Sequence, residues 1–372
     1  MLKIIDEGIL YCNPRPGYES IHAHFPFIEQ LSKEELICFY SRGSAMTSAD
    51  KVVAKLRSTD GGNTWKEEGI VWDPSRDDKR FCYYHGAATK LKNGKLIAVL
   101  TRFDRSNPDE LMWDPETGGY PDPDIVILRS EDNGRLWSKP EIVPLPEGMI
   151  GNHAGTIIEL DDKNLMLNFE TWKRSGDSEA AKQKSLALIS KNEGKSWDNL
   201  VTVGDGTEQE VYYFDQRITK LGNGRLLALF WTHDVKTDKD LMVHRSISND
   251  NGKTWSGPEP TNINGAVTYP VKLNDGRLLA VYVLRHGGKP GIMAVLSDDE
   301  GKNWDLKNQI RLWDAYGRDI IGIKKEGELE QMLGFAFGMP HAKLLSNGDI
   351  MSCFWCTSAS ITHIRWCKLK VE

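Results

Sequence analysis

The stretch RSTDGGNTW, residues 57–65, decides the fold because the chain repeats its pattern. Ser58 is followed two residues later by Asp60, then by Gly62 and Trp65. The same spacing returns in SEDNGRLW, SKNEGKSW, SNDNGKTW and SDDEGKNW, which begin at Ser130, Ser190, Ser248 and Ser297. One copy would be a weak signal for a turn, whereas five copies in order indicate a repeat architecture.

A second pattern alternates with the first and consists of two apolar runs joined by a short polar turn. The clearest copies are LKNGKLIAVL, LGNGRLLALF and LNDGRLLAVY, and the variants are LSKEELICFY, LDDKNLMLNF and LSNGDIMSCF. Asn-Gly and Asp-Gly between apolar runs predict tight β-hairpins, since both turn residues adopt positive φ.

These six hairpins, five of them followed by the Ser-x-Asp/Asn repeat, predict six four-stranded antiparallel sheets. Such sheets bury their faces by stacking around an axis, so we expect an all-β, six-bladed β-propeller that forms one domain over residues 1–372. The sixth unit lacks the Ser-x-Asp/Asn repeat and ends at ITHIRWCKLKVE. We expect the strand-like start MLKIIDEGIL to complete that blade and close the ring.

Composition narrows the partners and the location. The formal net charge is −6, and no basic run occurs, so nucleic-acid binding is not expected. No apolar stretch approaches ~18 residues and no signal peptide is recognisable, so we expect no membrane partner and a cytoplasmic location. Cys353 and Cys356 form a CxxC inside a strand-like run, which favours core cysteines over a redox or zinc site.

The five Ser-x-Asp/Asn repeats resemble the Asp-boxes, or BNR repeats, of the sialidase (neuraminidase) superfamily, whose catalytic domain is a six-bladed propeller. The resemblance spans essentially the whole chain and implies carbohydrate chemistry, but the family's catalytic pattern is not matched. His-Phe-Pro at residues 24–26 stands where the family has Arg-Ile-Pro, and Trp231 replaces a second carboxylate-binding arginine. Asp215 stands at the position of the family's glutamate, and Asp50 lies near that of its acid.

Met339 stands where the family has its tyrosine nucleophile. Methionine cannot act as that nucleophile, and neither His nor Trp offers the two-pronged hydrogen bonding that arginine gives a carboxylate. We therefore expect a sialidase-like fold without sialidase activity.

We expect the chemistry on the face opposite the hairpin turns, around the axial channel, where inner strands start and second strands end. Five of the nine histidines fall at inner-strand starts, namely His22, His24, His85, His153 and His341. The candidate catalytic residues are Asp215, His24, His85, His153, Glu170 and Tyr269. The candidate substrate-binding residues are Arg42, Asp50, Arg102, Arg217, Trp231, Arg285, His341 and Trp355.

Three chemistries fit these residues. Glycoside hydrolysis needs an acid and a base or nucleophile on opposite sides of the sugar, for which Asp215 with a histidine, or Glu170 with Asp215, is suited. Elimination from a uronate-containing glycan needs a His or Tyr base. A divalent metal held by His24, His85 and His153 would act as a Lewis acid, although no short metal motif occurs, and no other cofactor is expected.

The leading hypothesis is an exo-acting glycoside hydrolase on small glycosides or oligosaccharides. The long insertion at residues 102–124 is expected to overhang the channel and narrow it, and the connection at residues 312–340 is expected to form a second wall. The alternatives are a lyase on uronate-containing oligosaccharides and a non-catalytic glycan-binding propeller.

Overall fold

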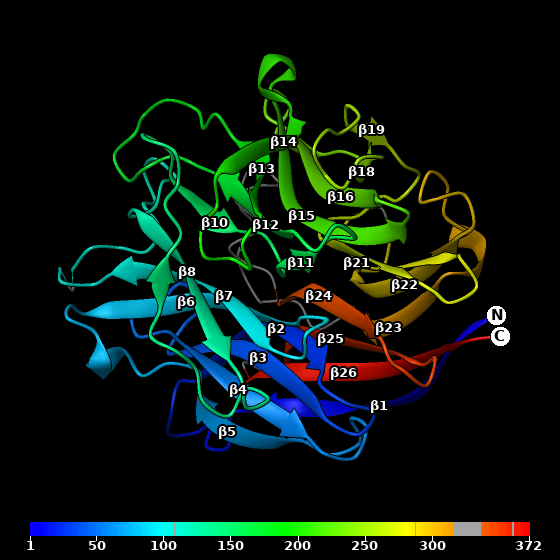
Figure 1. Cartoon of the computed structure of the whole chain (residues 1–372), viewed down its shortest axis with the longest axis horizontal. Coiled ribbons are helices and arrows are strands. Elements are labelled where there is room, and N and C mark those ends of the chain that lie inside the picture. Colours follow the sequence, from blue (N-terminus) through cyan, green and yellow to red (C-terminus); the bar gives the residue numbers. More distant parts are fainter. Residues whose placement is uncertain (108, 287, 316–335, 359–360) are drawn as a thin grey trace.

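The computed structural model describes residues 1–107, 109–286, 288–315, 336–358 and 361–372 of the chain. The strands in these residues form six antiparallel sheets, arranged as blades around a central axis (Figure 1). The prediction of an all-β, six-bladed propeller is confirmed.

The blades follow one another along the chain, and in each the first strand lies innermost. Blades 1 and 2 contain β2 (His22–Gln30), β3 (Leu36–Gly43), β4 (Val52–Ser58), β5 (Lys66–Ile70), then β6 (Phe81–Lys90), β7 (Leu96–Asp104), β8 (Pro123–Ser130) and β9 (Glu141–Ile142). Blade 3 contains β10 (Gly151–His153), β11 (Ile158–Glu159), β12 (Leu165–Thr171), β13 (Lys184–Ser190) and β14 (Asn199–Asp205).

Blade 4 contains β15 (Val211–Gly222), β16 (Arg225–Asp234), β17 (Lys239–Asp240), β18 (His244–Ser248) and β19 (Glu259–Pro260). Blade 5 contains β20 (Thr268–Lys272), β21 (Leu278–Leu284), β22 (Gly291–Ser297) and β23 (Ile310–Asp314). Blade 6 contains β24 (Phe337–Leu344), β25 (Ile350–Ser358), β26 (Ile361–Val371) and β1 (Leu2–Cys12). Three short 3₁₀ helices lie at Pro74–Arg76, Thr207–Gln209 and Leu306–Asn308.

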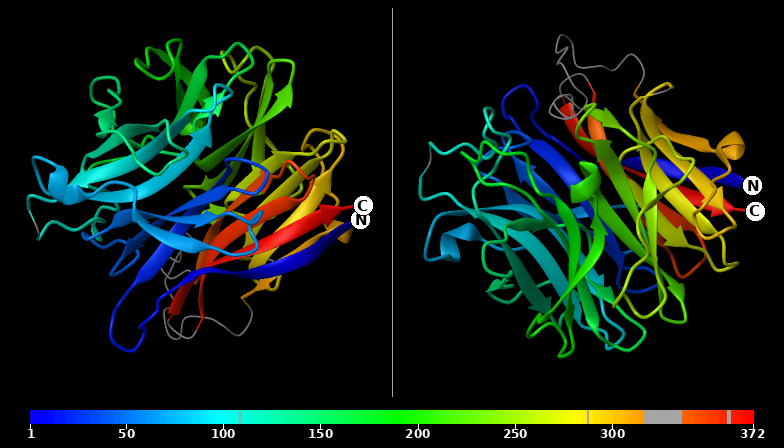
Figure 2. Two further views of the ribbon diagram at one scale, coloured as in Figure 1. Left: turned by 60° about the horizontal axis from the view of Figure 1, so that its bottom comes forward. Right: turned by 90° about the horizontal axis from the view of Figure 1, so that it is seen from above.

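The first strand of the chain closes the ring, as expected. β1 is the outermost strand of blade 6 and pairs with β26 from Leu2↔Val371 to Cys12↔His363. The two chain ends therefore lie side by side (Figure 2). Blade 6 thus combines both ends of the sequence, which ties the first blade to the last.

The Ser-x-Asp/Asn repeats form one kind of turn. In blade 4 the Ser248 hydroxyl accepts from the Gly252 amide at 2.9 Å and donates to Asp250 at 2.9 Å. The Trp255 indole then donates to the Gly252 carbonyl at 3.2 Å. Gly252 has a φ of 76°, a conformation that glycine adopts without steric cost. The serine contacts recur in all five copies, so each repeat satisfies its own polar groups.

The same turns also join neighbouring blades. A Cβ on Gly252 would lie 2.1 Å from the Cε of Met166, which belongs to the second strand of blade 3. A Cβ on Gly62 would lie 2.6 Å from the Cε of Met351 in blade 6, so the contact also occurs where the ring closes. The repeats therefore contribute to the stacking of the blades.

Antiparallel pairing places the repeats and the hairpin turns on one face of the disc. In blade 2, Lys90 pairs with Leu96 beside the hairpin turn, and Leu96 pairs with Ser130, which begins the repeat. The other ends of these strands, near Phe81 and Asp104, lie on the opposite face. A functional site at this mouth of the channel is therefore built from the starts of inner strands and the ends of second strands.

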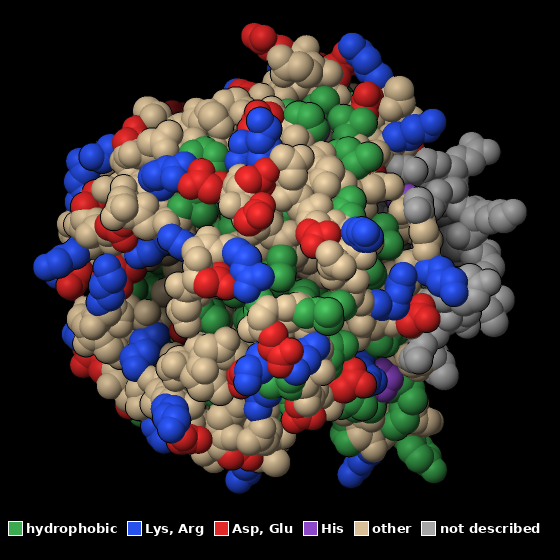
Figure 3. All heavy atoms as spheres, turned by 90° about the vertical axis from the view of Figure 1, so that its right-hand side faces the viewer, with side chains coloured by type: hydrophobic (Ala, Val, Ile, Leu, Met, Phe, Trp, Pro, Cys, Tyr) green, Lys and Arg blue, Asp and Glu red, His purple; other side chains and the backbone are tan. Residues whose placement is uncertain are grey.

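Other sequence expectations concern the core and the surface. Cys353 and Cys356 are buried and free in β25, in agreement with core cysteines. No helix in the described ranges is long and apolar enough to cross a membrane. Acidic and basic side chains are interspersed over the described part of the face shown in Figure 3.

Candidate functional site

Four inner strands carry an irregularity near their starts. The pairing register shifts between His24 and Phe27, Tyr83 and Gly86, Phe214 and Arg217, and Gly338 and His341. Three residues in these bulges have positive φ, namely Phe25 (54°), Asp215 (51°) and Met339 (48°). A bulge re-aims a side chain, and strained backbone of this kind concentrates at functional sites. Phe25, Asp215 and Met339 all line one cavity at the channel.

This cavity has two adjoining lobes. The two lobes enclose about 680 and 970 Å³, including the space open to solvent. Both lobes are lined by His85, Trp113, Tyr120, Asn152, Asp215 and Trp231. Glu170 and Trp172 belong to the first lobe, while Arg285, Met339 and Trp355 belong to the second. Aromatic rings from several blades dominate the lining.

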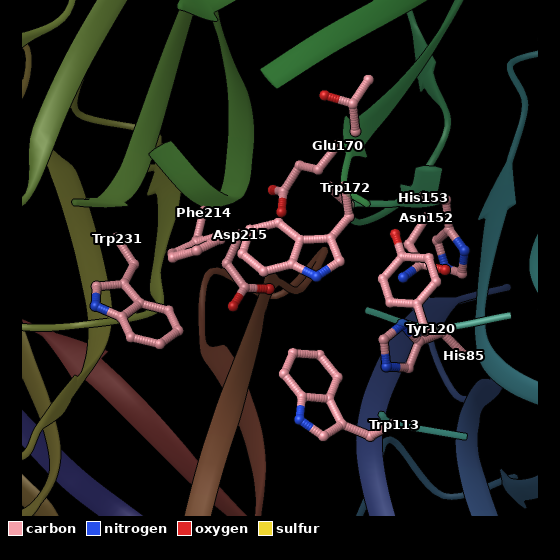
Figure 4. Close-up of a pocket in the computed structure, with 12 residues that line it drawn as sticks. His85, Trp113, Tyr120, Asn152, His153, Glu170, Trp172, Phe214, Asp215 and Trp231 are labelled. Carbon is pink, nitrogen blue, oxygen red and sulfur yellow. The ribbon is translucent and has the colours of Figure 1, made fainter. Parts of the chain in front are cut away.

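Two carboxyl groups with unlike surroundings enter the first lobe (Figure 4). Glu170, near the end of β12, accepts a hydrogen bond from the Gln216 amide at 2.7 Å. Burial and then the nearby Asp215 carboxylate raise the pKa of Glu170 well above its usual range. Glu170 is therefore the group that keeps its proton near neutral pH.

Asp215 is paired with a buried cation. The Arg217 guanidinium donates to Asp215 Oδ1 at 3.0 Å, and the Arg217 side chain is almost completely buried. Arg217 is anchored in turn by the Ala154 carbonyl of blade 3, at 2.8 Å from its NH1. Arg217 thus positions Asp215 without lining the cavity itself. A buried carboxyl with a raised pKa and a second carboxyl paired with an arginine, both lining one lobe, form an arrangement suited to acid–base chemistry.

Only two of the aligned histidines line the cavity. His85 and His153 lie with their rings 5.7 Å apart, and Thr101 Oγ1 hydrogen-bonds to His153 Nδ1 at 2.8 Å. Burial and then the Arg217 charge lower the pKa of His153 to about 3, and burial also lowers the pKa of His85. Both rings are therefore neutral near pH 7, suited to hydrogen bonding rather than to supplying a proton.

Three polar atoms of lining residues are buried and have no hydrogen-bond partner among the described residues. They are His85 Nε2, Asn152 Oδ1 and Trp355 Nε1. A buried polar group without a partner is costly, so such groups mark places where a ligand completes the hydrogen bonding. Together they offer a donor, an acceptor and a ring nitrogen that can be either, which suits sugar hydroxyl groups.

Arg285 and Trp231 form the cationic side of the second lobe. The Arg285 guanidinium lies 5.0 Å from the centre of the Trp231 ring. The Trp231 indole donates to Asp240 at 2.7 Å, which fixes the ring. Burial lowers the pKa of Arg285 to about 10, so this group stays charged at neutral pH. Both predicted substrate-binding residues thus lie where a ligand can reach them.

Of the expected ring of histidines, only His85 and His153 line the cavity. His24 packs against Trp355, with ring centres 4.8 Å apart, and is almost completely buried. His341 packs against Tyr269 at 4.4 Å, and its Nδ1 accepts from the Ile28 amide at 3.2 Å. His24, His341 and Tyr269 do not line the cavity. In β2 and β24 the bulge residues Phe25 and Met339 line it instead of the histidines. The predicted catalytic roles of His24 and Tyr269 therefore have no support from their positions.

Three more predicted ligand residues are engaged elsewhere. Arg42 pairs with Glu67 of the outermost strand of blade 1, and Asp50 accepts from Ser44 within its own loop. Arg102 pairs with Asp124 at 2.9 Å. None of Arg42, Asp50 and Arg102 lines the two lobes. Their position near the channel end of a strand is accounted for by local ion pairs and hydrogen bonds.

The possible metal site also lacks the necessary cluster. Among the described residues, no group of three or more His, Cys, Asp or Glu side chains is placed to hold a metal ion. The His24 ring stacks on His22 and meets Trp355 edge-on, while the His85 ring meets His153 edge-on.

Several residues that line the cavity were not predicted from the sequence. Met112, Trp113 and Tyr120 lie in the insertion at residues 102–124, whose expected position over the channel is confirmed. The aromatic residues of this insertion were the sequence feature that could have identified them as lining residues. Phe214 was not predicted, because nothing in the local sequence distinguishes an aromatic residue that lines a cavity from one that packs in the core. Most of the expected second wall, residues 316–335, lies outside the described residues.

Comparisons with known proteins agree with the fold. No protein-family model matches the chain. The chain is similar to a protein of unknown function from Dyadobacter fermentans, with 17% identity and a TM-score of 0.75 over 100% of this chain and 99% of that one. It is also similar to the intramolecular trans-sialidase of Ruminococcus gnavus, with 12% identity and a TM-score of 0.68 over 97% of both chains.

A third similar structure is the α-L-arabinanase of Penicillium chrysogenum, solved with arabinobiose. The identity is 14% and the TM-score 0.65, over 98% of both chains. At these identities the likeness shows the fold, a six-bladed propeller of the kind found in sialidases and an arabinanase.

Proposed function

We propose that the protein is a glycoside hydrolase in which Glu170 acts as the acid and Asp215 as the base or nucleophile. The observation that carries the proposal is the pair of carboxyl groups in one aromatic-lined cavity, one buried with a raised pKa and the other paired with Arg217. Divergent environments of this kind assign the acid and the base.

The steps follow from these two environments. Glu170 donates its proton to the glycosidic oxygen as the bond to the anomeric carbon breaks, so the leaving sugar departs as a neutral alcohol. The Asp215 carboxylate either attacks the anomeric carbon to form a glycosyl ester, which water then hydrolyses while Glu170 takes up the water's proton, or it accepts the proton of a water molecule that attacks this carbon directly. Arg217 donates a hydrogen bond to Asp215 and so holds this side chain in position. His85, Asn152 and Trp355 then supply hydrogen bonds to sugar hydroxyl groups.

The shape of the cavity supports exo action on small substrates. The insertion that carries Met112, Trp113 and Tyr120 covers one side of the channel mouth. A chain end or a short oligosaccharide fits such a site better than the middle of a polymer. Two structures of similar fold are, by their names, a trans-sialidase and an arabinanase, which supports a carbohydrate substrate. A cytoplasmic location stays a prediction from the sequence.

Sialidase activity itself is not part of the proposal. Trp231 and Met339 line the cavity at the positions where the resemblance would place an arginine and the tyrosine nucleophile. A lyase is also less well supported, because the candidate base Tyr269 packs against His341 instead of lining the cavity.

The test is a screen of aryl glycosides, disaccharides and uronate-containing oligosaccharides with the wild-type protein and Asp215→Asn. We expect release of sugar from at least one glycoside and a loss of turnover in Asp215→Asn of roughly 10²–10⁴-fold. Asp162→Asn, an exposed carboxylate on the hairpin face, is the matched control and should keep full activity.

Two results would contradict the proposal. A product that absorbs in the near ultraviolet through a new C=C bond, without hydrolysis, would indicate a lyase. Saccharide binding without turnover of any compound would indicate a glycan-binding propeller.

A further inference from the structure

Two indole rings face one another at the edge of the first lobe. Trp113 comes from the insertion of blade 2, and Trp172 follows β12 of blade 3 (Figure 4). The ring centres lie 6.4 Å apart and the planes differ by only 24°. Both side chains line the cavity and are partly exposed to it.

The pair is held in place by a dense set of contacts between the two segments. The Trp172 indole donates to the Gly118 carbonyl at 2.7 Å. Tyr120 and Arg174 form a backbone bridge, and Arg174 pairs with Asp122 at 2.8 Å. The segments approach so closely that a Cβ on Gly119 would lie 2.1 Å from the Arg174 carbonyl oxygen. Trp172 therefore depends for its position on the segment that carries Trp113.

A ring that is fixed before the ligand arrives loses little conformational entropy on binding. The far side of Trp172 is supported by Tyr212 and Phe214, with ring centres at 5.3 and 5.5 Å. The flat apolar faces of such rings suit the C–H faces of a sugar, while the sugar's hydroxyl groups remain free for polar partners.

The pair also has a defined place relative to the proposed acid. Glu170 lies near the end of β12, and Trp172 directly follows this strand. Both line the first lobe. The acid protonates the oxygen of the leaving group, so the ring beside it is next to the sugar that departs.

We propose that Trp113 and Trp172 form a subsite for the leaving-group sugar, so that the protein acts on disaccharides and longer oligosaccharides in preference to glycosides with a small leaving group. This inference rests on the proposed function of the same cavity. It assigns the aromatic pair a part in specificity, beyond fastening the insertion to blade 3.

The experiment measures binding by titration calorimetry in the Glu170→Gln background, so that no turnover interferes. The probes are arabinobiose, cellobiose, lactose and xylobiose, each beside its constituent monosaccharides. We expect at least one disaccharide to bind roughly tenfold more tightly than its monosaccharide, which corresponds to about 1.4 kcal/mol. Trp113→Ala and Trp172→Ala should each remove that advantage and leave the monosaccharide affinity within about twofold.

Two further variants separate binding from folding. Trp113→Phe keeps a flat ring and should retain most of the disaccharide advantage. Leu111→Ala changes an exposed side chain of the same insertion, which lines neither lobe, and should change nothing. Melting temperatures of all variants show whether the insertion remains in place.

The outcomes distinguish failure of the leaving-group subsite from failure of the proposed function. A disaccharide advantage that persists in folded Trp113→Ala and Trp172→Ala overturns the subsite and leaves the proposed function intact. Equal affinity for disaccharides and monosaccharides in the Glu170→Gln protein also overturns the subsite. If no saccharide of the panel binds, the proposed function fails, and this inference fails with it.

Discussion

The hairpin face of the propeller carries five copies of one turn, whereas the cavity face carries different side chains in almost every blade. On the hairpin face, Ser248, Asp250 and Gly252 complete one another's hydrogen bonds, and the other repeats do the same. On the cavity face, equivalent inner-strand bulges present Phe25, Asp215 and Met339.

The difference teaches where this fold can vary. The polar groups of the repeated turn are hydrogen-bonded within the turn, and the turn also contacts the next blade. A substitution there therefore disturbs the packing between blades. The bulge residues project into open space, so their identity is free to serve a ligand. The two faces should therefore respond differently to mutation, one in stability and the other in activity.

The largest expected effect belongs to the cavity face. Glu170→Gln should lower glycoside turnover by roughly 10²–10⁴-fold, because the amide cannot donate the acid's proton. The amide oxygen can still accept from the Gln216 amide, so the melting temperature should not fall. Steady-state kinetics and thermal melts of the same preparation check both parts. Turnover that survives the substitution would remove Glu170 from the mechanism.

The next effect belongs to the hairpin face. Gly252→Ala should lower the free energy of unfolding by about 2–4 kcal/mol, because the new methyl group meets buried Met166 and the backbone has positive φ. Gly276→Ala is the matched control, since its φ is 93° but nothing lies within 4 Å of the added atom. Its cost should be about 1–2 kcal/mol.

Urea unfolding of the two glycine variants measures this difference. Equal destabilisation would mean that the repeat's contact with the neighbouring blade contributes little, and that only backbone strain matters at these turns. Activity per folded molecule should be unchanged in both variants.

A smaller effect should appear at the wall of the cavity. Gly119→Ala should displace the insertion from Arg174 and raise KM for oligosaccharides about tenfold, with kcat for small aryl glycosides unchanged. The measurement is a comparison of KM and kcat for the two substrate types. A parallel loss of melting temperature and kcat would instead show that this contact supports the whole fold.

A further expected effect is a difference in the pH dependence of stability. The folded-state pKa of Glu170 is raised by burial and by Asp215, so its stabilising contribution is complete below the ordinary glutamate pKa and is lost as pH rises through the raised value. Glu170→Gln cannot ionise and lacks this loss. The variant's melting temperature relative to wild type should therefore increase between about pH 5 and about pH 9. Parallel curves would contradict the raised pKa.

The sequence determined the fold because its signals are local and repeated. The Ser-x-Asp/Asn-x-Gly spacing fixes a turn through hydrogen bonds within eight residues, and Asn-Gly between apolar runs fixes a hairpin. Counting these units was enough to predict six blades, closure by β1, and an insertion over the channel. Glu170, Asp215, Trp231 and Arg285 were also placed correctly at the channel by their strand positions.

Only the tertiary structure decided which neighbours of these residues enter the cavity. A bulge shifts the alternation of a strand by one residue, so His24 and His341 turn into the packing while Phe25 and Met339 line the cavity. The contrast between Glu170 and Asp215 likewise arises from partners distant in sequence, such as Arg217 held by the carbonyl of Ala154 in blade 3. Burial and long-range contacts leave no local mark in the sequence, which is why the chemistry of the cavity required the folded chain.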